Sequence, residues 1–281
     1  MNGQYGPYHF FSPQFSSLYA WRSIGVSTYH GMLVSLRHRM ASGLQFDFNY
    51  TLSKSMDMGS DAERITEWGG LGGTIINAWS PRQKYGLSDF DARHQINANW
   101  TYELPVGRGK RWGGGWNGFL NHLAGGWAIS GLARWANSYP TSVNSGYTWA
   151  TNWQLSSNAV QIGPMPATGT YMDADGDPNL FQNTTQAMKS FRAAFAGESG
   201  QRNNLYGPGY FGIDGGISKA WQLAEGHNLK FSWEVFNTTN SVRFDAGSAT
   251  TFALDAGPSF GKFGQTVTNK RVMQFALRYE F

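Results

Sequence analysis

Apolar and polar residues alternate along several stretches of the chain. From position 44 to position 53, five apolar side chains at even positions are interleaved with five polar side chains at odd positions. An alternation of period two places one set of residues on each face of a β-strand. The pattern therefore predicts seven strands, four strongly patterned (44–53, 95–102, 229–235 and 273–281) and three weaker (about 25–40, 127–135 and 211–219).

The predicted strands are long enough to cross a bilayer. Several reach about ten residues, the length that a tilted transmembrane strand needs, whereas strands of soluble sandwiches are nearer five or six residues. The apolar set is rich in aromatic residues and the opposite set carries charges, which is typical of a lipid-facing surface and a wet lumen. We therefore expect an all-β fold, an antiparallel transmembrane β-barrel segment. The residues expected to face its lumen include Asp47, Asn49, Lys230, Glu234 and Arg278.

The connections between the predicted strands differ in length from one side to the other. Residues 41–43 and 224–226 form tight turns, whereas three connections are long: about 53–88, 137–209 and 237–269. The connection 105–125 is intermediate, and a short helix is expected at 117–123. Because outer-membrane barrels have short periplasmic turns and long extracellular loops, we expect the short turns in the periplasm. The chain would then begin in an extracellular loop, and seven strands would be part of a larger barrel.

Composition narrows the function classes. The chain is 14% charged with a net charge of +4, and its basic residues form no long run, so nucleic acid is not an expected partner. With 0 Cys it has neither disulfides nor thiolate metal sites. No apolar run approaches the roughly 18–20 residues of a membrane-spanning helix. Residues 1–11 lack the pattern of a signal peptide, so we expect the true N-terminus to lie upstream.

Candidate chemistry is sparse. Asp173, Asp175 and Asp177 are spaced so that alternate carboxylates can converge on a hard cation, but the following residues do not complete a calcium-loop pattern. A solvated extracellular turn is the favoured interpretation, with metal binding as the weaker one. The six histidines show no metal-ligand spacing, and the chain has no Gly-x-Ser-x-Gly elbow. We expect neither an enzyme nor a cofactor.

Aromatic residues gather in and beside the longest connection. They could stack on a sugar or peptide ligand, or they could pack the loop against itself, and the sequence does not decide between the two. These residues are Tyr147, Trp149, Trp153, Tyr171, Tyr206 and Tyr210.

Several motifs, taken in their order and spacing, resemble the late barrel of TonB-dependent outer-membrane receptors. Nearest is the Oar-like group, which carries a carboxypeptidase-regulatory-like N-terminal domain. The C-terminal run 274–281 resembles the terminal signature of outer-membrane proteins, in which alternating apolar residues end in Phe. The other matching runs are Tyr85–His94, Glu103–Gly109, Gly125–Gly131, Gly207–Phe211, Glu234–Asn237 and Phe263–Gln265.

The resemblance implies a particular barrel size and a transport function. Residues 1–281 would be the C-terminal portion, about the last third, of a 22-stranded barrel whose lumen is plugged. The plug domain, the contact with TonB and the first strands would lie outside this sequence. The intact protein would take up a scarce, unknown ligand across the outer membrane of a Gram-negative-type bacterium. The barrel-assembly machinery would recognise the terminal residues Phe275, Leu277, Tyr279 and Phe281.

Two other functions remain open at this point. A passive, self-contained barrel or an adhesin would have an even number of strands and an upstream signal peptide. A secreted all-β carbohydrate-binding module, using the 12 Trp residues, would have shorter strands and would be soluble without detergent.

Overall fold

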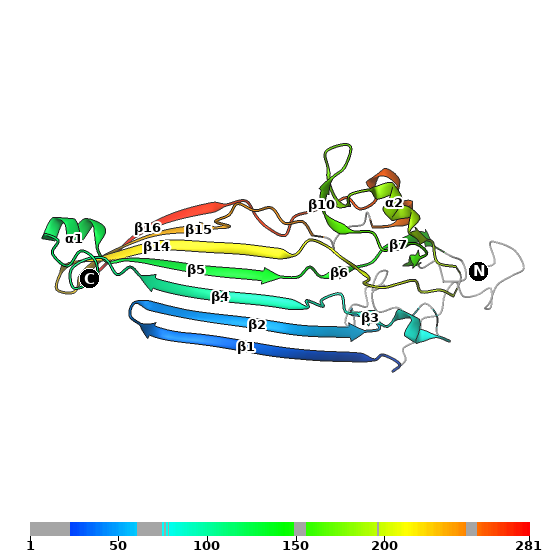
Figure 1. The fold of residues 1–281 in the computed structure, drawn as a ribbon, viewed down its shortest axis with the longest axis horizontal. Helices are drawn as coiled ribbons and strands as arrows, with labels where there is room; N and C mark the ends of the chain where they lie inside the picture. Colours follow the sequence, from blue (N-terminus) through cyan, green and yellow to red (C-terminus); the bar gives the residue numbers. More distant parts are fainter. Residues whose placement is uncertain are drawn as a thin grey trace, which may run out of the picture.

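The computed structural model describes residues 23–60, 75, 77, 79–148, 156–195, 197–245 and 252–281. In this part of the chain, seven long antiparallel strands form one curved sheet, here called the wall (Figure 1). The described parts of the connections 137–209 and 237–271 fold together at one end of the wall and are called the cap. Among the described residues, no helix combines the length and the hydropathy needed to cross a membrane.

The wall is a meander in which every long strand pairs with its neighbours in the sequence. Its order is β1-β2-β4-β5-β14-β15-β16, and the short β3 (Gly86–Leu87) pairs with the end of β2. All seven predicted strands are present, so the predicted all-β antiparallel fold is confirmed. Their bounds are β1 Ser27–Ala41, β2 Leu44–Asp57, β4 His94–Glu103, β5 Trp127–Ala136, β14 Tyr210–Ala224, β15 His227–Phe236 and β16 Val272–Glu280.

The register between neighbouring strands mainly pairs apolar residues with apolar residues and polar residues with polar residues across the wall. Phe46 lies opposite Trp100 between β2 and β4, and Trp233 lies opposite Phe275 between β15 and β16. Since a slip of one residue would move a strand's apolar set to the other face, this agreement fixes the pairing. The wall therefore has one apolar face and one polar face.

The apolar face is exposed to its surroundings. Leu36 is 58% exposed, Phe275 66% and Leu277 67%. In water such a long apolar surface would be covered by another layer of protein. Lipid covers it in a membrane, which is consistent with the strand lengths of 9 to 15 residues.

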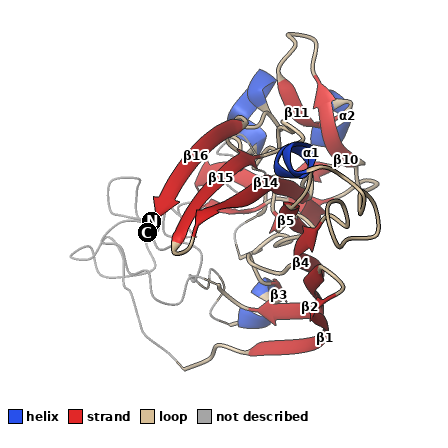
Figure 2. Ribbon diagram, turned by 90° about the vertical axis from the view of Figure 1, so that its left-hand side faces the viewer, coloured by secondary structure: helices blue, strands red, loops and turns tan. Residues whose placement is uncertain are grey.

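The wall is an open arc in the part of the chain that the structure describes (Figure 2). β1 pairs only with β2, and β16 pairs only with β15, so each has one edge without a partner among the described strands. Backbone groups along such an edge need hydrogen-bond partners inside a bilayer. The described strands therefore do not close into a barrel by themselves.

The connections divide by length between the two ends of the wall, as expected. At the short-turn end, the β1–β2 turn consists of Ser42 and Gly43, with φ angles of 52° and 81°. Two consecutive positive φ angles are typical of the type I′ turn that joins twisted strands. The helix α1 (Gly118–Ala124) is at the same end, as predicted, and the Asn117 side chain caps it by accepting a hydrogen bond from the Leu120 N–H at 2.8 Å.

The cap contains short strands and helices and the only cluster of buried hydrophobic residues found in the described chain. Phe181 stacks on Phe260 with 5.3 Å between ring centroids and also contacts Phe252. The cluster consists of Val143, Ala159, Leu180, Phe181, Ala187, Phe191, Leu205, Phe252 and Phe260. The cap is therefore a folded unit with its own core. The described wall is a single sheet without such a core, and lipid covers its apolar face.

The bounds of the remaining elements complete the description of the long-loop end. They are η3 Pro81–Lys84, β6 Pro140–Thr141, β7 Asn144–Thr148, β8 Ser156–Asn158, β9 Val160–Gln161, β10 Thr168–Met172, β11 Pro178–Phe181, α2 Thr184–Lys189, β12 Phe191–Arg192, β13 Leu205–Tyr206 and η5 Leu254–Ser259.

Replacing Phe181 with alanine should unfold the cap locally and leave the wall intact. Phe181 is 2% exposed, and removing a buried Phe side chain costs about 3–5 kcal/mol. Hydrogen exchange followed by mass spectrometry should show faster exchange in 178–192 and unchanged exchange in the wall strands. Ile162→Ala is the matched control, because Ile162 is a cap residue that is 60% exposed. Equal protection in both variants would contradict a separate cap core.

Candidate functional site

The polar face of the wall carries ladders of paired polar side chains. Asp47 accepts a hydrogen bond from the Arg37 side chain, and Asn49 accepts one from the Ser35 hydroxyl at 2.7 Å. Each pair joins β1 to β2 at directly opposed positions. These cross-strand contacts order a face that would be solvated in a barrel lumen.

A second polar ladder joins β15 to β16. Lys230 forms an ion pair with Glu280 at 2.7 Å, and Arg278 lies 3.9 Å from the same carboxylate. Glu234 accepts a hydrogen bond from Gln274 at 3.1 Å. All five residues expected to face a lumen thus lie on the polar face, two of them on β2 and three on β15 and β16. Contact of these residues with a plug stays a prediction.

The predicted assembly signal lies on the apolar face of β16 and just after it. Phe275 stacks on Trp233, and Tyr279 stacks on His227, each with 5.8 Å between ring centroids. The Tyr279 hydroxyl is also 2.7 Å from His227 Nδ1. Phe281 is 91% exposed. The alternating aromatic row is therefore accessible from the lipid side, and its recognition by the assembly machinery stays a prediction.

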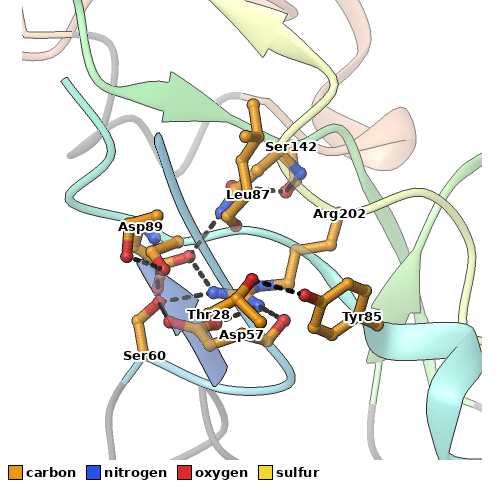
Figure 3. A network of polar contacts seen from close by, with 11 residues as sticks. Thr28, Asp57, Ser60, Tyr85, Leu87, Asp89, Ser142 and Arg202 are labelled. Carbon is orange, nitrogen blue, oxygen red and sulfur yellow. Dashed lines mark hydrogen bonds and ion pairs between the residues drawn. The ribbon is translucent and has the colours of Figure 1, made fainter. Parts of the chain in front are cut away.

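A buried arginine joins the cap to the wall (Figure 3). The Arg202 guanidinium donates to Asp57 Oδ1 at 2.6 Å, at the end of β2, and to Asp89 Oδ1 at 2.8 Å. The Arg202 side chain is 5% exposed and that of Asp57 is 11% exposed. Hydrogen bonds between ions in such a dry setting are short and strong. This site could not be found from the sequence, because the partners are 113 and 145 positions from Arg202.

Asn203 extends this junction. Its side-chain amide donates to the Leu87 carbonyl at 2.7 Å and to Asp89 Oδ1 at 2.6 Å. Its backbone N–H donates to the Ser142 hydroxyl at 2.8 Å, and its φ of 55° is in the left-handed region that Asn tolerates. Two consecutive cap residues therefore hold the segment between β3 and β4 through a shared carboxylate.

A cavity of 380 Å³ lies beside the junction. It is lined by residues of the cap and of the segment around η3, namely Gln83, Tyr85, Val160, Glu198, Ser199, Gly200, Gln201, Arg202 and Asn204. Both polar atoms of the Asn204 amide are buried and have no hydrogen-bond partner among the described residues. The lining is mostly polar and includes the charged residues Glu198 and Arg202, so the cavity is a candidate subsite for a polar ligand at the long-loop end.

Two charged groups near the cavity, Lys84 and Glu198, have shifted pKa values. Burial, together with the positive charge of Arg202, lowers the pKa of the Lys84 ammonium to about 8. On the other side, Arg192 donates two hydrogen bonds to Glu198, at 2.7 and 3.0 Å, and these hold the pKa of the Glu198 carboxyl below its usual value. Lys84 is thus a charged group that can be neutralised in a moderately alkaline medium.

The Asp173, Asp175 and Asp177 carboxylates do converge, but on a lysine. Lys262 Nζ lies 3.2, 3.4 and 2.8 Å from them, respectively. The N–H of Asp177 donates to Asp173 Oδ1, and this bond, with the Lys262 ammonium, keeps the pKa of Asp173 low. No three His, Cys, Asp or Glu side chains in the described ranges are placed to hold a metal ion. The geometry favours the turn closed by an ion pair, and the sequence could not indicate Lys262 because it lies in another connection.

Three of the six aromatic side chains expected in or beside the longest connection lie in the described part of the chain. Tyr206 is 37% exposed, and Tyr171 and Tyr210 are half-buried. Tyr210 lines a second, smaller cavity of 290 Å³ together with Trp135 and Arg243. Tyr171, Tyr206 and Tyr210 are not part of the cap core. Trp149 and Trp153, and the side chain of Tyr147, lie outside the described residues.

Comparison with known proteins supports the membrane interpretation. A family model described as an outer membrane beta barrel domain matches residues 2–274. No curated protein and no solved structure gives a significant match.

Replacing Arg202 with methionine should loosen the cap from the wall. The change leaves the Asp57 carboxylate buried without its ionic partner, and breaking a buried pair costs about 3–5 kcal/mol. Hydrogen exchange should accelerate in 86–92 and 199–206. Lys110→Met is the control, because Lys110 pairs with Glu103 while both side chains are about half-exposed, so its loss should cost under about 1 kcal/mol. Unchanged exchange in Arg202→Met would show that the junction does not stabilise the cap.

Lys84 should make the stability of the junction depend on pH. Its folded pKa is about 8 and its unfolded pKa is about 10.4, so between these values the unfolded chain binds more protons and stability rises with pH. In detergent, wild type should gain about 2–3 kcal/mol relative to Lys84→Met between pH 7 and pH 10, measured by urea unfolding with Trp fluorescence. The exposed Lys189 provides a charge-matched control in Lys189→Met. A difference between wild type and Lys84→Met that does not vary with pH would refute the effect.

Proposed function

Since this chain belongs to the outer membrane beta barrel domain family, we propose that it forms part of the wall of a TonB-dependent transporter that takes up a scarce ligand. The protein is located in the outer membrane of a Gram-negative-type bacterium. By the general rule for such barrels, the short-turn end faces the periplasm and the cap is extracellular. The narrower assignment, active transport, rests on the shape of the wall and on the cap.

The open arc is the observation that carries the proposal. The outer edges of β1 and β16 need further strands in lipid, so the closed barrel has more than seven strands. Barrels of 8 strands are filled by their own side chains, whereas those of 22 strands enclose a plugged lumen. Barrels of 16–18 strands leave an open channel, so we assign this wall to the wider, plugged class, in which opening the lumen requires energy. A plug domain and a contact with TonB in further parts of the polypeptide would supply these functions.

The cap supports the proposal from the outside. A folded unit at the long-loop end, fixed to the wall by Arg202 and Asn203, presents a cavity lined mainly by polar residues. Ligand capture at this point would precede passage along the polar face. There, residues such as Asp47 and Lys230 would line the path or touch the plug. We propose no catalytic step.

The motifs that resemble TonB-dependent receptors fall at structurally important points. The run Tyr85–His94 includes β3, Asp89 of the junction and the start of β4. The run Glu103–Gly109 begins the connection to α1, and Gly107, with a φ of 127°, fits closely against Gly125. These positions have structural reasons for their residues, which makes the resemblance more than compositional.

Uptake measurements can separate active transport from the alternatives. Mass spectrometry of the spent medium should show at least one solute that wild-type cells deplete and a gene-deletion strain does not. An uncoupler of the inner-membrane proton gradient should stop that depletion, because TonB transmits this energy. Depletion that continues with the uncoupler would indicate a passive barrel, and no difference between strains would indicate an adhesin or another binding role. Either result would refute the proposal.

A further inference from the structure

The helix α1 lies on the outer, convex side of the wall at the short-turn end (Figures 1 and 2). It belongs to the connection between β4 and β5, yet it packs beside β14. With 7 residues, such a helix has no stability of its own in water. Something on the wall must hold it in place.

Three side chains of the apolar face hold the C-terminal end of α1. Trp221 Nε1 donates to the His122 carbonyl at 2.8 Å, and Trp127 Nε1 donates to the Leu123 carbonyl at 3.1 Å. The Lys219 ammonium donates to both carbonyls. The last carbonyls of a helix have no partners within it and carry partial negative charge. A cation and two indole N–H groups satisfy them here.

Lys219 explains why a charge can lie on this face. By register it belongs to the apolar row, opposite Trp127 on β5 and Phe231 on β15. A lysine exposed on the lipid side of a barrel is destabilising. Lys219 is instead 5% exposed, and its ammonium lies 5.4 and 5.2 Å from the ring centroids of Trp127 and Trp221. It is a fastening point for α1 and not a surface charge.

The fastened helix presents apolar side chains outwards. Phe119 is 79% exposed and Leu123 63%, and their spacing of four residues places them on one side of the helix. Leu120 adds to this stripe, while Asn121 on another side accepts a hydrogen bond from the Arg108 N–H at 2.7 Å. The stripe continues the lipid-facing surface of the wall at its periplasmic rim.

Basic and aromatic residues flank the stripe. Arg108 and Arg111 are exposed, and the Arg111 guanidinium lies 5.6 Å from the ring centroid of Trp112, which is 56% exposed. Trp side chains prefer the boundary between headgroups and acyl chains, and Arg side chains beside them reach anionic headgroups. The combination of an apolar stripe with neighbouring cations fits a phospholipid leaflet.

We propose that α1 is an interfacial anchor that inserts Phe119 and Leu123 into the periplasmic leaflet of the outer membrane, with Arg108 and Arg111 on phospholipid phosphates. This inference rests on the proposed orientation of the wall, with the short-turn end in the periplasm. It assigns a lipid-binding role to a connection that would otherwise be a surface loop. It also fixes the depth at which the wall sits in the bilayer.

The chain has no cysteine, so single-cysteine variants can report depth directly. The full chain would be reconstituted in vesicles of phosphatidylethanolamine and phosphatidylglycerol, with an environment-sensitive fluorophore on Phe119→Cys or Leu123→Cys. Phe275→Cys is the control for deep lipid, because Phe275 is 66% exposed and is in register with Trp233 and with Ile217 in the middle of β14. Glu225→Cys on a tight turn is the control for water. Nitroxide-labelled lipids and aqueous iodide are the quenchers.

At positions 119 and 123, a nitroxide near the headgroups should quench at least about twofold more than one near the chain ends, as an interfacial depth requires. Glu225→Cys should respond to iodide and Phe275→Cys to the deep nitroxide. Quenching of positions 119 and 123 by iodide alone, or by neither reagent because protein covers them, would overturn the anchor while Phe275→Cys still reports lipid. If Phe275→Cys itself lacks lipid quenching, the proposed membrane wall fails first and the anchor with it.

Discussion

Backbone hydrogen bonding in a medium without water is the constraint on which this structure depends. In a bilayer every peptide N–H and C=O of a strand must pair with a neighbouring strand, so the seven strands form one continuous ladder. That ladder forces a common register, and the register sorts side chains into an apolar and a polar face. The same constraint applies to the outer edges of β1 and β16, which have no partner among the described strands.

The two ends of the wall meet water by different means. At the long-loop end, the chain builds a cap with a conventional aromatic core around Phe181 and fixes it through the buried Arg202–Asp57 pair. At the short-turn end there is no core, and α1 is held by Lys219, Trp127 and Trp221 of the lipid-facing row. The cap is thus stabilised by packing, whereas the other end depends on hydrogen bonds to the end of one short helix.

The wall could be predicted from the sequence because its signal is local. An alternation such as Leu44 to Ser53 states both the strand and its faces, and Asn117 indicates the start of α1. The junction could not be predicted, since Arg202 and Asp57 are 145 positions apart and either could have had another partner. Lys262 likewise meets the three aspartates from a different connection. The role of Lys219 could not be predicted for a different reason. A lysine in an apolar row is explained only by the position of α1, whose last carbonyls accept its hydrogen bonds.

The meander has a consequence for how such a wall can be built and altered. Because each strand pairs with its neighbour in sequence, every new hairpin can add to the edge left by the previous one, and no strand must be threaded between two that are already paired. β5 and β14 are adjacent although the whole first part of the cap separates them in sequence, and the entropy of closing a loop grows only slowly with its length. The long connections can therefore be exchanged or enlarged during evolution while the membrane-embedded scaffold keeps its geometry.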